Sequence, residues 1–186
     1  MSIETVATIC PTSREEWRDW LAAHHQTEDA IWLVYFKKSS GKPSLSWSDA
    51  VSEALCFGWI DSVKKTIDQD SYRQYFCKRK ATSGWSRINK DKVAELQAAG
   101  LMAAAGLASV ERAKENGSWT HLDSVEAMVI PDDLAAEFLL HPTAKTVFAK
   151  MSKTNQKQHL YRLHHLTGSK RTAYLAKMMG ELMGGG

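Results

Sequence analysis

The first clear pattern along the chain is an amphipathic helix close to the N-terminus. The segment TSREE (12–16) places Ser or Thr three residues before Glu, which is the spacing of a capping box. Beyond it, apolar and aromatic residues recur at helical spacing, so we expect the helix to run to about His25. One face of this predicted helix carries Trp17, Trp20, Leu21 and His24.

Three later segments have the pattern of β-strands. Residues 31–36 (IWLVYF) are a short run of β-branched and aromatic residues between polar segments, which is typical of a buried strand. Residues 63–67 and 72–79 are also strand-like, and the DQDS between them has turn composition, which predicts an antiparallel hairpin. With residues 31–36 the hairpin would form a small antiparallel sheet of about three strands.

Helical patterns alternate with these strands and follow them. A helix capped by Ser46 or Ser48 keeps its apolar spacing until the sequence GWID (58–61). Two further helices after the hairpin end at Gly100 and Gly117, since glycine commonly terminates a helix. We expect these last two helices to form a helical hairpin.

The C-terminal third predicts only helices. Residues 118–130 lack helical periodicity and look like a connection, whereas Pro131 followed by two aspartates is a favourable helix start. From there we expect about four helices, with breaks at His141-Pro142, at Ser152 and near Thr167-Gly168.

These patterns predict an α+β fold, in which a small antiparallel sheet packs with helices and an all-helical C-terminal region follows. We expect the α+β domain to span residues 1–120 and the helical region to span residues 121–186, packed on the first. The length of 186 residues fits one domain with an appended element.

Composition narrows the class of protein. Apolar residues make up 44% of the chain and there are seven tryptophans, which argues against disorder. The three cysteines, Cys10, Cys56 and Cys77, form no CxxC spacing, so neither a disulfide framework nor a zinc knuckle is indicated. The N-terminus lacks the pattern of a signal peptide, and no apolar stretch reaches transmembrane length. We therefore expect a cytoplasmic protein without a transmembrane segment.

Charge is unevenly distributed along the chain. Residues 64–92 carry nine basic and three acidic side chains, and residues 141–186 carry eight basic and one acidic. The segments before and between them are acidic. Two interpretations remain open at this point: acidic and basic elements face each other in the fold, or the basic segments form a positive surface.

The basic hairpin segment is the strongest functional lead. Alternation along 72–79 puts Tyr72, Phe76 and Lys78 on one face, and Arg73, Tyr75, Cys77 and Arg79 on the other. Cations interleaved with aromatic rings suit an anionic ligand or a nucleic acid. Our candidate ligand-binding residues are Trp59, Asp61, Arg73, Tyr75, Arg79, Trp85, Arg87 and Lys90. Trp59 and Asp61 would fix the corner, and the other six would contact the anion.

Catalysis finds less support in the sequence. No GxSxG, P-loop, GxGxxG or HExxH motif occurs, so we predict no catalytic residues and no cofactor. The position of Cys56 late in an amphipathic helix favours core packing. Asp61 is expected to cap a turn or pair with Arg73 or Arg87. The alternatives are a small-molecule enzyme with a pocket near Cys56 and Asp61, and a C-terminal helical module that docks a protein partner.

Histidine spacing argues against a metal site. His159 and His164 diverge by about 140° around a helix axis, and His121 and His141 are isolated in the sequence. We therefore predict no metal ligands and leave the oligomeric state open.

Three segments together carry a resemblance to a known family. They are SEALCFGWIDS, YFCKRKATSGWSRINKDKVAEL and AAGLMAAAGLASVERAKENGSW, followed by the C-terminal LYRLHHLTGSKRTAYLAKMMGEL. In this order they resemble the YdeI/OmpD-associated, or bacteriocin-protection, proteins of bacteria. The resemblance implies an α+β N-terminal part with a helical C-terminal part, and a stress-related accessory role in protection against bacteriocins or cationic peptides through an envelope partner. It implies no particular mechanism.

Overall fold

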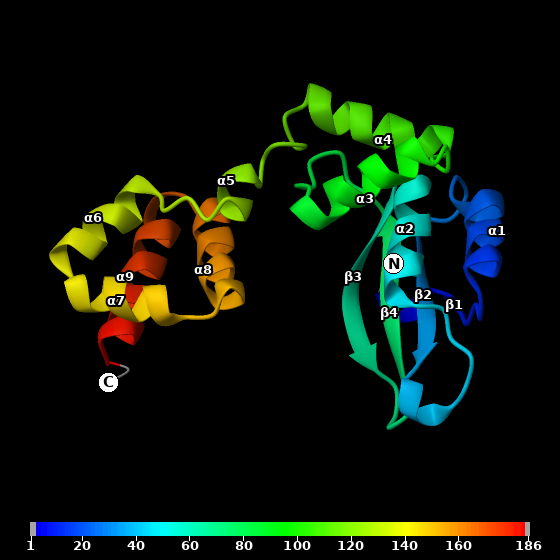
Figure 1. Ribbon diagram of the computed structural model, residues 1–186, viewed down its shortest axis with the longest axis horizontal. Helices are drawn as coiled ribbons and strands as arrows, with labels where there is room; N and C mark the ends of the chain where they lie inside the picture. The colour runs from blue at the N-terminus through cyan, green and yellow to red at the C-terminus, as the bar shows by residue number, and fades with distance from the viewer. Residues whose placement is uncertain (1–2, 185–186) are drawn as a thin grey trace. The chain divides into compact units, whose positions relative to one another are not determined.

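The chain folds into two compact units. The structure is a computed structural model that describes residues 3–184, with the first unit ending at Thr120 and the second beginning at His121. Figure 1 shows the first unit in blue to green and the second in yellow-green to red. No helix among the described residues is long and apolar enough to span a membrane.

The first unit is built on a four-stranded sheet with strand order β1-β2-β4-β3. Antiparallel pairing joins β2 to β4 and β4 to β3, while β1 runs parallel to β2. The elements are η1 (Ile3–Thr5), β1 (Thr8–Ile9), α1 (Arg14–His24), β2 (Ala30–Phe36), η2 (Lys38–Ser40), α2 (Trp47–Cys56), β3 (Trp59–Thr66), β4 (Ser71–Lys78), α3 (Arg87–Ala98) and α4 (Ala104–Glu115). The α+β fold and the three antiparallel strands are thus confirmed, but the sheet is mixed because β1 adds a fourth strand.

Polar caps set the helix starts. Ser13 accepts a hydrogen bond from the Glu16 backbone N–H, as the predicted capping box requires. The Glu16 carboxylate accepts from the Thr12 N–H at 2.7 Å, one residue before the cap, so the box is present in a variant form. Of the two serines considered for α2, Ser46 is the cap, since its hydroxyl accepts from the Asp49 N–H at 3.1 Å. The strand β3 begins at Trp59, so the GWID sequence is a helix-to-strand junction.

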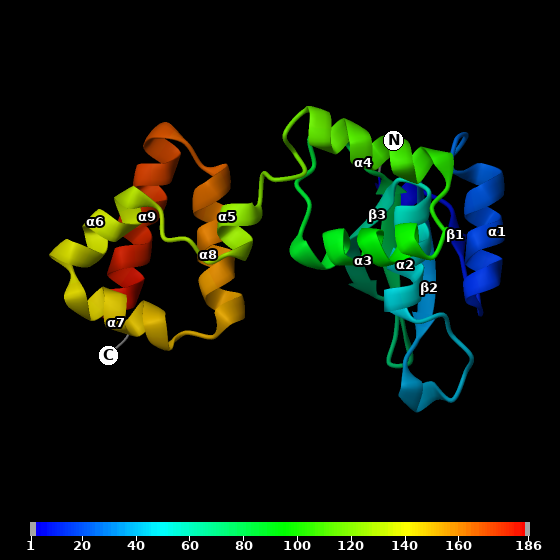
Figure 2. The ribbon, with the colours of Figure 1, turned by 45° about the horizontal axis from the view of Figure 1, so that its top comes forward.

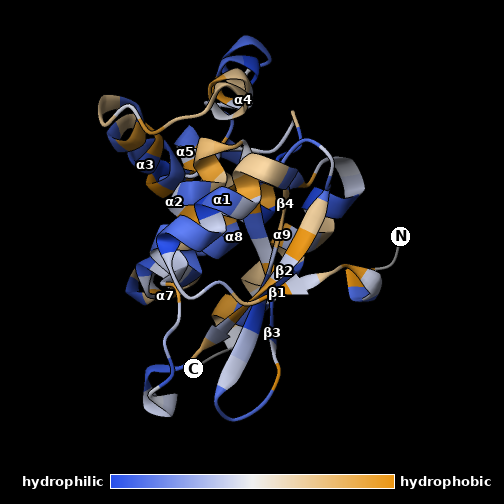
Figure 3. Cartoon of the chain, turned by 90° about the vertical axis from the view of Figure 1, so that its right-hand side faces the viewer, coloured by the Kyte–Doolittle hydropathy of each residue, from blue (hydrophilic) through white to orange (hydrophobic). Residues whose placement is uncertain are grey.

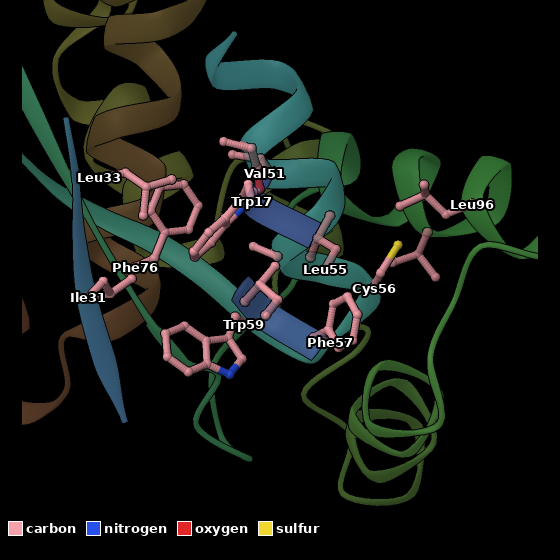
Figure 4. Packing of buried hydrophobic residues seen from close by; sticks show 14 of the residues in the cluster. Trp17, Ile31, Leu33, Val51, Leu55, Cys56, Phe57, Trp59, Phe76 and Leu96 are labelled. Atoms are coloured by element: carbon pink, nitrogen blue, oxygen red, sulfur yellow. The ribbon is translucent and has the colours of Figure 1, made fainter. Parts of the chain in front are cut away.

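The core lies between the sheet and the helices α1 and α2 (Figures 1 and 2). Trp17 of α1 packs edge-on against Phe76 of β4 at 5.5 Å, and its indole N–H donates to the Ala50 carbonyl of α2. Figure 4 shows this packing from close by. In Figure 3 the hydrophobic colour marks β2, whereas β3 is mostly pale to blue. The core face of β4 carries Tyr72, Gln74 and Phe76, which matches the predicted alternation.

A close helix contact connects α4 to the end of α2. The Ala103 N–H donates to the Cys56 carbonyl at 3.0 Å, and Gly106 lies directly on that same carbonyl. A Cβ at Gly106 would stand 2.6 Å from the Cys56 carbonyl carbon and 2.8 Å from the Leu55 oxygen. Gly58, with φ of 74°, makes the turn from α2 into β3. Glycine at both positions lets the α4 backbone reach the GWID junction.

The second unit is all helical. Its helices are α5 (Asp123–Glu126), α6 (Asp132–Leu140), α7 (Pro142–Lys150), α8 (Lys153–His165) and α9 (Gly168–Gly184). Ser152 caps α8 by accepting from the Asn155 N–H, as the break predicted there requires. Leu134, Phe138, Phe148, Leu160 and Met178 are among the residues of its separate core. The short helix α5 lies within the segment for which no helix was expected.

One ion pair fastens three helices of this unit. Arg171 of α9 donates from Nε and Nη2 to both carboxylate oxygens of Asp133 at 2.6 and 2.7 Å, and from Nη1 to the Leu163 carbonyl at the end of α8. The hydrogen bonds from Arg171 lower the pKa of Asp133 below its ordinary value of 3.8.

Asp133→Asn is expected to cost about 1 kcal/mol of stability at pH 7, a modest value because the pair is partly exposed to solvent. Since the folded pKa is lowered, this stabilisation is present above the unfolded pKa of about 3.8 and is lost as the pH falls through the folded pKa, so the stability difference should persist at about pH 4 and disappear only below the folded pKa. Urea unfolding followed by far-UV circular dichroism measures the difference. The control Glu181→Gln removes an exposed partner of Lys177, 3.7 Å away, and should change little. An equal loss at all pH values would contradict the ion-pair origin.

Candidate functional site

The candidate ligand-binding residues lie in three separate environments of the first unit. Trp59 is in the core, Arg73 and Tyr75 lie on the outer face of the sheet, and Arg79 lies with Trp85 beyond the end of β4. They do not form one continuous surface.

The two residues expected to fix the GWID corner have different partners. Trp59 is 0% exposed, packs edge-on against Trp20 at 5.8 Å and donates from its indole to the His25 carbonyl. Asp61 accepts from the Trp47 indole at 3.0 Å and from the Gln74 amide at 3.1 Å. Asp61 therefore ties the start of α2 to β4.

The expected ion pair of Asp61 with Arg73 or Arg87 is wrong, since Asp61 pairs with neither arginine in the structure. Asp61 is in register with Phe76, on the face of the sheet that the helices cover, whereas Arg73 is in register with Lys65 on the opposite face. Arg87 is the exposed first residue of α3. The bulge between Asp61 and Lys64 lets the Asp61 carboxylate keep its neutral partners on the covered face.

The outer face of the sheet carries a paired arginine. The Arg73 guanidinium lies 4.3 Å from the centre of the Trp32 ring, and Tyr75 packs edge-on against the same ring at 5.1 Å. Arg73 also donates to Glu4 at 2.9 Å, and Glu4 pairs with Lys65 as well. Hydrogen bonding to Lys65, followed by the Arg73 charge, lowers the pKa of Glu4. Arg73 and Lys65 thus share one carboxylate, which offsets part of the positive charge on this face.

Arg79 has a different environment. It is 8% exposed, its guanidinium lies 3.7 Å from the centre of the Trp85 ring, and Nη2 donates to the Gly84 carbonyl. Its buried Nε has no hydrogen-bond partner, and no carboxylate of residues 3–184 lies within 4.0 Å of it. Burial lowers the pKa of Arg79 to about 10, against the opposing charge of Asp61, so the side chain stays charged at neutral pH.

Trp119 completes this group, which we call the Arg79 cluster: Arg79, Trp85, Lys90 and Trp119. The Trp85 and Trp119 rings lie 4.9 Å apart, and the Lys90 ammonium lies 5.4 Å from the Trp119 ring centre. Asn116 and Ser118 both donate to the Ala81 carbonyl at 2.9 Å, which fastens the Trp119 segment to the loop after β4. Sequence reasoning missed Trp119, since it lies in a segment without periodicity.

Cys56 has no catalytic arrangement. Its side chain is 0% exposed, and Figure 4 shows it on the side of Leu96, away from Phe76. Burial, followed by the charge of Glu53, raises the pKa of the thiol, which disfavours the reactive thiolate. Asp61 has Trp47 and Gln74 as partners, so the structure does not bring the two residues of the enzyme alternative into a shared contact.

The histidines of the second unit pair in ways that sequence spacing does not show. His121, isolated in the sequence, has its Nε2 3.0 Å from Nε2 of His164. His159 shares a hydrogen bond of 2.8 Å between Nδ1 and the Tyr174 hydroxyl, and burial lowers its pKa. Among residues 3–184 no three His, Cys, Asp or Glu side chains gather in a way that could hold a metal ion.

The second unit contains a cavity of about 850 Å³ that the sequence did not predict. It lies along α8, bounded by the end of α5 and by α9. Its lining includes Glu126, Met128, Lys157, His159, Arg162 and Tyr174. The α8 cations that line it belong to the basic segment 141–186, for which the sequence left open whether it forms a positive surface.

Two family models match the chain, one within the first unit and one within the second. Residues 9–109 match the family model described as Domain of unknown function (DUF8412). The chain belongs to the DUF8412 family. Within this match lie GWID, SGWS and most of the Arg79 cluster. Neither the curated proteins nor the solved structures contain a match to this DUF8412 protein.

The helical unit matches a second family. Residues 127–184 match the model described as Bacteriocin-protection, YdeI or OmpD-Associated. The resemblance inferred from sequence is therefore confirmed for this part of the chain. The first two motif segments and residues 98–109 of the third lie within the DUF8412 match.

Proposed function

We propose that this protein is a bacterial accessory binding protein, working in the cytoplasm, that holds a small oxyanion at the Arg79 cluster. The observation that carries the proposal is the buried guanidinium of Arg79, which has an unpaired Nε and no carboxylate within 4.0 Å among the described residues. The match of residues 127–184 to the bacteriocin-protection family supports an accessory role in protection against bacteriocins.

The physical basis is the cost of an unpaired buried charge. A guanidinium removed from water is unfavourable unless it is paired or hydrogen-bonded, and Trp85 offsets only part of that cost through its ring. A carboxylate or phosphate would accept from the unused donor. The helix α3 begins directly after Ser86, so its positive N-terminal end adds to the potential beside Trp85.

Accessibility favours a small ligand over a nucleic-acid strand. Arg79 and Trp85 are 8% and 2% exposed, so they offer no open platform for stacked bases. The exposed Arg87 is the first residue of α3, two residues after Trp85, and adds a further positive charge to this part of the chain.

The test is a tryptophan-fluorescence titration with inorganic pyrophosphate and with a short single-stranded oligonucleotide, at about 50 and about 200 mM salt. All seven tryptophans lie between Trp17 and Trp119, so the signal reports on the first unit alone. Saturable quenching by pyrophosphate supports the proposal. Binding of the oligonucleotide alone, with a steep salt dependence, would make the first unit a nucleic-acid binder instead.

Arg79→Met should weaken pyrophosphate binding by at least about tenfold, because a hydrogen bond to a charged group contributes about 1.5–3 kcal/mol. Stability should stay within about 1 kcal/mol of wild type, because Met keeps contact with the Trp85 ring. The matched control is Arg73→Met, in which the lost arginine is already paired with Glu4. Equal weakening in both variants, or unfolding of Arg79→Met with unchanged affinity in Arg73→Met, would argue for a purely structural Arg79.

A further inference from the structure

The cavity along α8 is positively charged and partly aromatic. Three cations, Lys153, Lys157 and Arg162, line it, and Glu126 is the one acidic residue of its lining. Lys157 pairs with Glu126 at 2.6 Å, and this carboxylate is largely buried. The net charge of the lining at neutral pH is thus positive.

Two of these cations have no carboxylate partner. Neither Lys153 nor Arg162 has an acidic oxygen within 4.0 Å among residues 3–184. Arg162 is held at the wall, because its guanidinium lies 5.4 Å from the centre of the Tyr174 ring. The Tyr174 hydroxyl is in turn fixed by its hydrogen bond with His159. One wall therefore presents a positioned guanidinium beside two rings.

The cavity lining also includes a residue with a strained backbone, Met128. Met128 has φ of 58°, and the N–H groups of Met128 and Val129 donate to the carbonyls of Val125 and Ser124 to close α5. Glycine usually takes this left-handed position at a helix end, since other residues adopt it at a conformational cost. Met128 keeps a thioether side chain that lines the cavity and packs on the unit core.

We propose that this cavity binds a small aromatic carboxylate. The carboxylate would accept two parallel hydrogen bonds from the planar guanidinium of Arg162. The apolar body would lie against Met128, Tyr161 and Tyr174, where the flexible thioether and the rings suit a planar ligand. The volume of about 850 Å³ is within the usual range for small-molecule sites.

This site is independent of the Arg79 cluster. All its residues belong to the unit that begins at His121 and matches the bacteriocin-protection family. Failure of one proposal therefore leaves the other unaffected.

The experiment is a two-dimensional NMR titration of the full chain with 2-naphthoate and with its neutral isostere 2-naphthamide. NMR detects binding at millimolar ligand and reports which residues respond. The expected result is saturable binding of naphthoate at one site per chain, at least about tenfold tighter than naphthamide. Responding residues should include Met128, Arg162 and Tyr174. Equal affinity for the two ligands, or responses confined to other residues, would overturn the proposal without any variant.

Variants provide the second arm. Arg162→Gln should weaken naphthoate binding by about tenfold and leave naphthamide binding unchanged. The matched control Lys170→Gln removes one exposed cation of α9 that does not line the cavity. Arg79→Met should leave naphthoate binding unchanged. The same loss in Lys170→Gln as in Arg162→Gln would show a nonspecific charge effect and refute the site.

Discussion

Gly106→Ala is expected to lower the free energy of unfolding of the first unit by about 3 kcal/mol, the upper part of the range for overpacking. The added Cβ would meet the Cys56 carbonyl and stand 2.8 Å from the Leu55 oxygen. These are backbone atoms at the end of α2 and cannot rotate away. The helix α4 must therefore shift and loosen the hydrogen bond from Ala103 to Cys56. Urea unfolding followed by tryptophan fluorescence measures the loss, because all the tryptophans lie in this unit.

Gly180→Ala is the matched control. It is also a helical glycine, but apart from the neighbouring backbone of its own helix nothing lies within 4 Å of the position of its Cβ. The substitution should stabilise α9 by about 0.5–1 kcal/mol through helix propensity alone, as followed by circular dichroism. If Gly106→Ala gained stability as Gly180→Ala should, the close packing of α4 on α2 would be refuted.

Local signals account for the elements that the sequence predicts well. Serines at the starts of α1, α2, α3 and α8 accept from the backbone N–H groups three residues on, and Gly100 and Gly117 follow the helices they end. Such signals involve neighbouring residues and therefore appear in the sequence itself. The strand β1 was missed because its two residues are too few to show alternation, and its parallel pairing with β2 is set by tertiary contacts.

The candidate site was only partly predictable for a related reason. Alternation places Arg73 and Arg79 on the same face, but it does not show that Arg73 pairs with Glu4, 69 residues away, while Arg79 has no such carboxylate partner among the described residues. Nor does it show that β4 ends at Lys78, so that Arg79 turns into contact with Trp85. The cavity of the second unit is lined in part by Met128, whose left-handed backbone no residue pattern indicates. The sequence shows which residues are charged, but the fold determines which charges pair with one another.

Substitutions at the GWID junction test whether it is a packed corner or a reactive or binding site. Trp59 is 0% exposed and surrounded by the core, so Trp59→Ala should cost about 4 kcal/mol, as is usual for a large buried aromatic residue. Trp47, at the start of the preceding helix, is 46% exposed and makes its hydrogen bond to Asp61. Trp47→Ala should therefore cost about 1 kcal/mol or less, mainly the loss of that hydrogen bond.

Urea unfolding of both variants, followed by fluorescence of the remaining tryptophans, decides between the interpretations. A large loss for Trp59→Ala with a small loss for Trp47→Ala means that Trp59 acts through packing and positions Asp61 only by holding the start of β3. A Trp59→Ala protein as stable as wild type, with pyrophosphate binding abolished, would instead move the binding site to the junction. Because Trp59 has no exposed surface while Arg79 has an unused donor, we expect the first outcome.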